Sequence, residues 1–276
     1  MKKIEFENAV AAYVKNDASN FVKAEVALRP ELTGMRIYDE AIFGYASAED
    51  PYFTEAKKTE IIGPHFMTPA EWLAGAKTVI SVFLPFTAQV REANRQNMGW
   101  PADEWLHGRI EGQVFQVNLS RFVEELFTKK GLVVLVPMTD PRFSTANPNV
   151  SDKTAQASYT SNWSERHAAY VAGLGTFGLS KGLITRKGTA GRILSIITDA
   201  VFEPDKRPYT GVTDYCINCG ACIRNCPAAA ISAEKGKIHH LCSEFLNSVK
   251  AKHAPYYGCG KCQVKVPCED KAPGTP

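Results

Sequence analysis

Eight cysteines lie near the carboxyl end of this 276-residue chain, and the first 215 residues contain none. Four of them occur in YCINCGACIRNCP, residues 215–227, at the spacing C-x2-C-x2-C-x3-C followed by proline. Thiolates at this spacing hold 4Fe-4S clusters, because one winding loop can present three soft ligands to one cubane. The segregation of the cysteines also predicts a separate module.

The fourth cysteine of this run predicts a second cluster. In two-cluster ferredoxins the cysteine before the proline binds the other cluster. The eight cysteines make two sets of four with none left over, although spacing alone leaves the fourth ligand of each set open. We assign one 4Fe-4S cluster to Cys216, Cys219, Cys222 and Cys268, and the other to Cys226, Cys242, Cys259 and Cys262.

Two zinc sites of four cysteines are the alternative, and the pair in GCGKC, residues 258–262, would suit one of them. Zinc sites usually use separated pairs of cysteines, so the unbroken run favours iron–sulfur clusters. We expect His239 and His240, beside Cys242, to face solvent rather than bind metal.

A glycine motif upstream resembles a dinucleotide fingerprint. Gly173, Gly175 and Gly178 in GLGTFG match G-x-G-x-x-G. That motif needs a strand before the glycines and a helix after them, whereas here a helix precedes and the loop-like SKGLITRKG follows. We predict a tight turn that brings the backbone against a neighbouring strand or a flat cofactor.

Composition narrows the class of protein. The formal net charge is +3, without the long basic runs of a nucleic-acid or membrane-surface protein. No stretch reaches the roughly 18 apolar residues of a membrane span. Glu5 and Glu7 interrupt the amino terminus where a signal peptide needs an apolar run, so we predict a cytoplasmic protein with reduced thiols.

The expected elements alternate between helix and strand, which predicts an α/β (α+β) fold. Residues 36–53 have no clear period. The expected helices are residues 1–17, 67–76 with Thr68 as N-cap, 109–131, and 164–173 with Ser164 as N-cap; the expected buried strands are 78–86, 132–138 and 193–200. The proline-rich segment 203–214 predicts a boundary between domains 1–205 and 206–276.

Four segments resemble the epoxyqueuosine reductase family, whose relatives are the reductive dehalogenases. They are SERHAAYVAGLGTFGLSKGLIT, ILSIITD, CINCGACIRNCP and GCGKC, and the resemblance spans roughly residues 77–268. It implies a nitroreductase-like, cobalamin-binding domain followed by a small ferredoxin-like module with two 4Fe-4S clusters. In such proteins the clusters feed electrons to a base-off cobalamin.

The chain also departs from that family. Tyr159 stands where epoxyqueuosine reductases carry a catalytic aspartate, and reductive dehalogenases use a tyrosine as proton donor; the alternative is an ordinary packed tyrosine. Lys153, Arg166 or Lys181 would be the cation that keeps its proton mobile. A tyrosine and histidine stretch of the family is replaced here by EWLHGRIEG, in which His107 and Arg109 would be the equivalents.

The family's helical repeats that help hold tRNA are not expected here, because the sequence stops at Pro276, and nucleic acid is therefore an unlikely partner. The pattern D-x-H-x-x-G, which supplies a histidine to cobalt in other cobalamin proteins, is also missing, as base-off binding allows.

Taken together, the sequence predicts an oxidoreductase that passes single electrons from an external ferredoxin- or flavodoxin-class donor, through two 4Fe-4S clusters, to cobalamin and a small-molecule substrate. Tyr159 is the expected catalytic proton donor; Gly173, Gly175, Gly178 and Arg166 are the expected cofactor-binding residues. The alternatives are an electron-transfer adaptor without a corrinoid, a flavin-linked reductase and a true epoxyqueuosine reductase.

Overall fold

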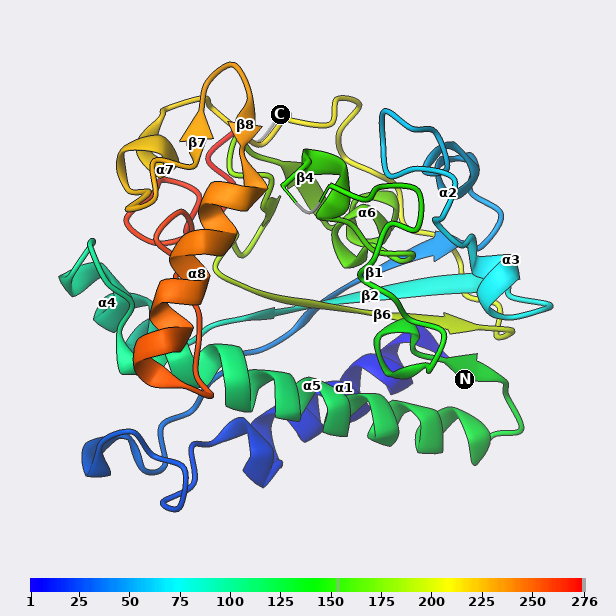
Figure 1. The fold of residues 1–276 in the computed structure, drawn as a ribbon. Helices are drawn as coiled ribbons and strands as arrows, with labels where there is room; N and C mark the ends of the chain where they lie inside the picture. The colour runs from blue at the N-terminus through cyan, green and yellow to red at the C-terminus, as the bar shows by residue number, and fades with distance from the viewer. Residues whose placement is uncertain (153, 275–276) are drawn as a thin grey trace.

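A four-stranded antiparallel sheet forms the centre of the fold (Figure 1). This computed structural model describes residues 1–152 and 154–274. The strands follow the order β1 (Ile42–Ser47), β2 (Thr78–Pro85), β6 (Gly191–Thr198) and β3 (Val134–Leu135). Every pairing between them is antiparallel, so the mixed α/β fold takes the α+β form.

Strand β2 is buried along its whole length, which confirms the position in mid-sheet predicted for residues 78–86. Its alternate side chains enter two cores, one on each face of the sheet. Ile80, Val82 and Leu84 pack into the core beneath α1 (Lys3–Asn16) and α5 (Asp103–Thr128). Figure 1 shows these two helices lying side by side across one face.

The opposite face is covered by short helices, namely α2 (Pro51–Glu55), α3 (Pro69–Trp72) and α6 (Glu165–Val171). Thr68 and Ser164 occupy the N-cap positions predicted for α3 and α6. The Ser164 hydroxyl accepts a hydrogen bond from the His167 N–H, and Thr68 forms a capping box with Glu71. These caps fix where the helices begin.

The cysteine-bearing part lies at one end of the sheet, beside α4 (Ala88–Gln96) (Figure 1). It contains α7 (Ala221–Arg224), the hairpin of β7 (Ile231–Ser232) and β8 (Gly236–Lys237), and α8 (His239–His253). Tyr209 and Tyr215 belong to the same core as α6, so the chain packs continuously across the boundary predicted near residue 205.

Several predicted elements differ from the structure. Residues 36–53, for which no clear period was found, contain β1 and α2, since pairing with β2 outweighs a weak local pattern. The helix predicted from residue 109 begins at Asp103. The loop-like segment after the glycines contains β5 (Leu183–Thr185), which pairs with β4 (Gly175–Phe177).

The strand predicted over residues 132–138 is shortened to β3, with only two residues. Val134 and Leu135 pair with Thr198 and Ile197 at the far end of β6. The chain then turns into the 3-10 helix η3 (Pro137–Thr139). In the described residues, the outer edge of β6 from Gly191 to Ile196 therefore has no strand beside it, which leaves room for a cavity.

The other 3-10 helices in the described residues are η1 (Ala18–Asn20), η2 (Pro30–Leu32) and η4 (Gln156–Ser158). None of the helices formed by residues 1–152 and 154–274 combines the length and the apolar character that crossing a membrane requires.

Candidate functional site

The structure brings Cys216, Cys219, Cys222 and Cys268 together around one small cavity. Burial and, after it, the neighbouring thiolates of the other three cysteines together raise the pKa of the Cys268 thiol to about 12. Three of these cysteines come from the loop before α7 and its first turn, and Cys268 comes from a loop more than 40 residues later. The tertiary fold, rather than the spacing of the cysteines in the sequence, therefore brings Cys268 to the other three.

The other four cysteines form a second group. Burial raises the pKa of Cys259 to about 12, with Cys262 and Cys242 as neighbouring thiolates, and Cys242 in turn lies near Cys262 and Cys226. The Ala230 N–H donates to the Cys226 sulfur at 3.3 Å, and the Lys237 ammonium lies 3.9 Å from the Cys262 sulfur. Hydrogen bonds to sulfur of this kind tune cluster potentials.

The two groups are neighbours. Burial raises the pKa of Cys222 to about 11, and the largest thiolate contribution comes from Cys262, in the other group. Within residues 1–152 and 154–274, no three His, Cys, Asp or Glu side chains converge closely enough to hold a single metal ion. The four thiols of the first group instead surround a cavity.

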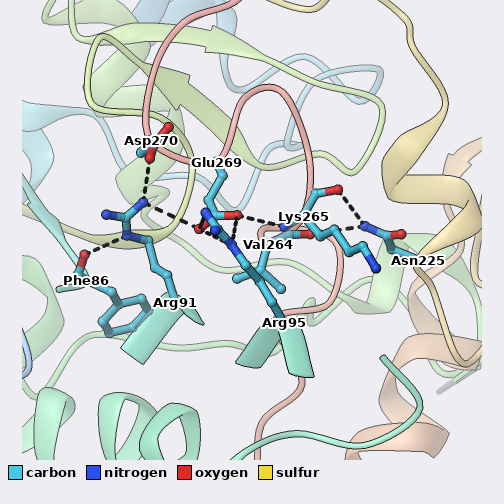
Figure 2. Close-up of polar contacts among 8 residues, drawn as sticks. All are labelled: Phe86, Arg91, Arg95, Asn225, Val264, Lys265, Glu269 and Asp270. Atoms are coloured by element: carbon cyan, nitrogen blue, oxygen red, sulfur yellow. Dashed lines mark hydrogen bonds and ion pairs between the residues drawn. The ribbon is translucent and has the colours of Figure 1, made fainter. Parts of the chain in front are cut away.

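An ion-pair network holds the loop that carries Cys268 against helix α4 (Figure 2). Glu269, whose side chain is 3% exposed, accepts hydrogen bonds from Arg95 at 2.5–3.0 Å and pairs with Arg91 at 3.4 Å. Arg91 also pairs with Asp270 at 2.8 Å. The backbone N–H of Lys265 donates to the second Glu269 oxygen at 2.7 Å, which closes the loop.

A larger cavity of about 950 Å³ lies along the open edge of β6. Helix α5 contributes Arg109, Gln113 and Arg121, α6 contributes Glu165 and Arg166, and β6 contributes Arg192 and Ile193; Phe83, Met138, Phe143 and Leu183 form apolar walls. The side-chain amide of Gln116 donates to the Ile193 carbonyl at 3.3 Å, so part of the unpaired strand edge is satisfied.

Glu165 is the one carboxyl group that lines this cavity within the part of the chain that is described. Burial raises its pKa to about 7, although the Ser195 hydroxyl donates to one of its oxygens. The other oxygen is buried without a hydrogen-bond partner. This carboxyl group therefore exchanges a proton near neutral pH.

Two residues near cysteines of the second group in the sequence line the cavity. Gln263, the residue after Cys262, lines it, as does Tyr257, two residues before Cys259. Arg166 faces the same space: burial lowers its pKa, while the nearby Cys262 thiolate raises it. Although protein atoms surround it, the Arg166 side chain is exposed through the cavity that it lines.

The predicted cofactor-binding glycines lie elsewhere, whereas Arg166 lines the cavity. A β-carbon on Gly175 would lie 1.9 Å from the Ile184 carbonyl oxygen, so this glycine permits the close pairing of β4 with β5. Gly173 has φ +82° and follows Ala172, the C-cap residue of α6, and Gly178 lines the small cysteine cavity. Of the two surfaces expected for the turn, a neighbouring strand or a flat cofactor, Gly175 contacts strand β5. Gly178 lies beside cysteines of the first group, a contact that was not expected.

Tyr159 follows η4, and its ring stacks on His239 at a centroid distance of 5.6 Å. It is not part of the cavity lining. Lys181 accepts a hydrogen bond from Arg166 through its backbone carbonyl at 2.7 Å, and Lys153 lies outside the described residues. His107 is fully buried and pairs with Glu111 at 2.8 Å, as a structural histidine does.

Sequence reasoning did not single out Glu165, Arg121 or Arg192 as functional residues. They come from α6, α5 and β6, and no local motif joins them. The polar residues on the cavity side of α5 were the available signal, but their partners on the other elements appear only in the fold.

Comparisons of this chain with protein families, with curated proteins and with solved structures find similar iron–sulfur proteins and reductases. The 4Fe-4S binding domain family matches residues 209–232. An epoxyqueuosine reductase of Listeria monocytogenes is 30% identical over 118 residues, covering 39% of this chain and 30% of that protein. A tetrachloroethene reductive dehalogenase of Desulfitobacterium hafniense is 46% identical over 68 residues, 24% of this chain and 12% of that protein.

The structure of the epoxyqueuosine reductase of Streptococcus thermophilus shares the fold, with a TM-score of 0.52 at 15% identity, over 99% of this chain and 70% of that one. The aligned segments span less than a third of the two curated relatives. By sequence and by fold, the relatives of this chain are therefore epoxyqueuosine reductases and reductive dehalogenases, and this chain is shorter than they are.

Proposed function

We propose that the chain is an iron–sulfur reductase in which two 4Fe-4S clusters deliver single electrons to a base-off cobalamin in the 950 Å³ cavity. The observation that carries this proposal is the position of the second cysteine group, because Gln263, next to Cys262, is part of the cavity lining. An electron held by a cluster on this group would therefore be close to a residue of the cavity wall. The relatives by sequence are also reductases.

The cysteine groups fit 4Fe-4S clusters by the chemistry of their ligands. Each group offers four thiols, the ligand set of a cubane. The first cluster would be held by the group containing Cys268, and the second by the group containing Cys262. Cys219 is exposed, so the first cluster would receive electrons from an external low-potential donor of the ferredoxin or flavodoxin class.

The cavity fits a large organic cofactor in size, since ligand sites range over about 300–1,000 Å³. Its walls combine apolar side chains with amides and guanidinium groups, which suits the mixed surface of a corrinoid. A bound corrinoid would supply a metal that accepts single electrons at low potential. The chain itself would enclose it between α5 and α6 and exclude water.

For the proton that a reductive step consumes, we propose Glu165. It lines the cavity and its pKa of about 7 leaves it partly protonated at neutral pH. Ser195 holds one carboxyl oxygen in place. Tyr159, predicted from the resemblance, stays the alternative donor. Glu165→Gln should lower turnover at least tenfold and Tyr159→Phe less than twofold; the reverse order would restore the role of Tyr159.

The experiment that tests the proposal is anaerobic reconstitution with iron, sulfide and cob(II)alamin, followed by electron paramagnetic resonance of the repurified protein. We expect two reduced-cluster signals and a base-off cob(II)alamin signal that stays with the protein. Cluster signals without cob(II)alamin would contradict corrinoid binding and favour an electron-transfer adaptor. A flavin released on denaturation of the protein as purified would favour a flavin-linked reductase.

Epoxyqueuosine reduction is the second candidate, because an epoxyqueuosine reductase is among the sequence relatives. It is tested with the reconstituted protein and a tRNA stem loop that carries epoxyqueuosine. Formation of queuosine would establish it and would also show that nucleic acid is a partner. Reduction of small halogenated substrates alone would support the first proposal, in which nucleic acid has no part.

A further inference from the structure

The large cavity has an unusual balance of charge. Arg109, Arg121, Arg166 and Arg192 all line it, whereas Glu165 is the one acidic residue of the lining. The Glu165 carboxyl group is partly neutral near pH 7, because burial raises its pKa to about 7. Four guanidinium groups, which stay charged at any physiological pH, therefore face a space with less than one full negative charge.

These arginines have few acidic partners. In the described part of the chain, none of the four forms an ion pair with a carboxylate. Arg192 donates to the Gln113 side-chain carbonyl at 3.0 Å, and Arg166 donates to the Lys181 carbonyl at 2.7 Å. Arg109 donates to the Tyr257 hydroxyl. Each of these neutral acceptors uses one N–H and orients the side chain without cancelling its charge.

Arg192 is a charged neighbour of two of the other three arginines. The pKa of Arg109 is lowered by burial and then by the neighbouring charge of Arg192. Burial also lowers the pKa of Arg166, and Arg192 adds to that shift. Arg192 therefore stands within electrostatic reach of both. Like charges held together beside a cavity have a cost that a bound anion would remove.

We propose that the four arginines form a binding site for the phosphate or carboxylate group of a cavity ligand. Guanidinium groups bind such oxygens with paired hydrogen bonds, and these are among the strongest in proteins. The apolar walls, which include Phe83, Met138, Phe143 and Leu183, would take the rest of the ligand. The ligand class is thus an anionic group on an apolar or aromatic body.

Two sources could supply this anionic group. One is an anionic small-molecule substrate, and this version rests on the proposed function. The other is the phosphodiester in the nucleotide loop of cobalamin, which cobinamide lacks. Both anionic groups would make the same contacts with the arginines. The experiment therefore has two arms: the first tests whether the arginines bind an anion, and the second tests whether that anion belongs to a substrate or to the cofactor.

The first arm measures anion binding by calorimetry. The probes are inorganic phosphate and benzoate, and the protein is the full chain with its clusters reconstituted but without a corrinoid. The variants are Arg192→Gln and Arg121→Gln, with Arg192→Lys to retain charge. The control is Arg186→Gln, because Arg186 is exposed in the turn after β5 and is not part of the lining.

We expect both anions to bind the wild-type protein and Arg186→Gln equally. Arg192→Gln and Arg121→Gln should weaken binding at least tenfold, and Arg192→Lys should weaken it less than Arg192→Gln. Iron content shows whether each variant is folded. If Arg192→Gln does not fold, Arg121→Gln replaces it in the test, because the Arg121 side chain makes no hydrogen bond in the described structure that the substitution would break. No binding to the wild type, or equal binding to all variants, would overturn the inference.

The second arm compares cobalamin with cobinamide. If the arginines bind the cofactor, Arg192→Gln weakens cobalamin binding at least tenfold, leaves cobinamide binding unchanged, and phosphate competes with cobalamin. If they bind substrate, cobalamin affinity is unchanged, and benzoate still binds the corrinoid-loaded protein. Anion binding to a protein that binds no corrinoid would contradict the proposed function while supporting the anion site.

Discussion

Arg95 on α4 and Glu269, the residue after Cys268, form an ion pair with N–O distances from 2.5 Å (Figure 2). The pair ties the final cysteine loop to a helix of the amino-terminal part. Glu269 is almost fully buried, and its carboxylate accepts hydrogen bonds both from Arg95 on α4 and from the backbone N–H of Lys265 in its own loop. The carboxylate therefore joins the loop to the helix and to itself. The position of Cys268, the last cysteine of the first group, thus depends on a contact between residues 174 positions apart in the sequence.

Glu269→Gln should loosen this loop. The substitution removes the buried charge that Arg91 and Arg95 face, so we expect a loss of roughly 1–3 kcal/mol in the free energy of unfolding and faster loss of iron from the first cluster. Urea unfolding and iron release under chelator measure the two effects. The control is Asp270→Asn, whose side chain is 52% exposed. Equal effects of both substitutions would contradict the role of Glu269.

Removal of one cysteine from each group should remove one cluster at a time. Cys268→Ala and Cys262→Ala are each expected to retain about half of the wild-type iron, with different cluster signals lost, because each group supplies its own four ligands. Iron analysis and paramagnetic resonance of the reduced proteins measure this. Ile217→Ala, at an exposed residue of the same module, is the control. Zinc in place of iron in the purified protein would instead support the zinc alternative.

Glu165 predicts a pH dependence of stability. Burial raises its pKa from 4.5 to about 7, so between these values the unfolded chain releases a proton that the folded chain keeps. The free energy of unfolding therefore falls as pH rises through this window, by roughly 3 kcal/mol from this group. In Glu165→Gln this contribution should be missing.

The measurement is urea unfolding of wild type and Glu165→Gln between pH 4.5 and 7.5. The difference between the two proteins isolates this carboxyl group from His167, whose pKa is lowered to about 4 by burial and by Arg166 and which acts in the opposite direction. Glu203→Gln, at an exposed position, should follow the wild type. A difference that does not change with pH would show that folding leaves the pKa of Glu165 unchanged.

Gly175→Ala should destabilise the protein by roughly 1–3 kcal/mol or prevent folding, because its β-carbon would collide with the Ile184 carbonyl oxygen. Gly99→Ala is the control, since the nearest atom to its added β-carbon is the side-chain oxygen of Asn97 at 3.4 Å. Thermal unfolding compares the two. Wild-type stability together with lost NADH binding would instead support a dinucleotide role for the glycine motif.

Local sequence determined several parts of this protein. The spacing of the four cysteines within residues 215–227 predicted an iron–sulfur module, and the 4Fe-4S binding domain family matches residues 209–232. The nearly continuous run of β-branched and apolar residues at positions 78–86 identified the central strand, because a strand buried on both faces has such a run. Thr68 and Ser164 marked helix starts, since a cap acts on its own backbone neighbours.

Tertiary structure decided what depends on distant residues. Cys268 joins Cys216, Cys219 and Cys222 because its loop packs on α4. The spacing of cysteines along the sequence carries no information about this packing. The cavity exists because β3 pairs with only two residues of β6, although the apolar run 132–138 was long enough for a full strand. Glu165 and the four arginines line this cavity from α5, α6 and β6. No periodic pattern in the sequence relates residues that lie on two different helices and a strand.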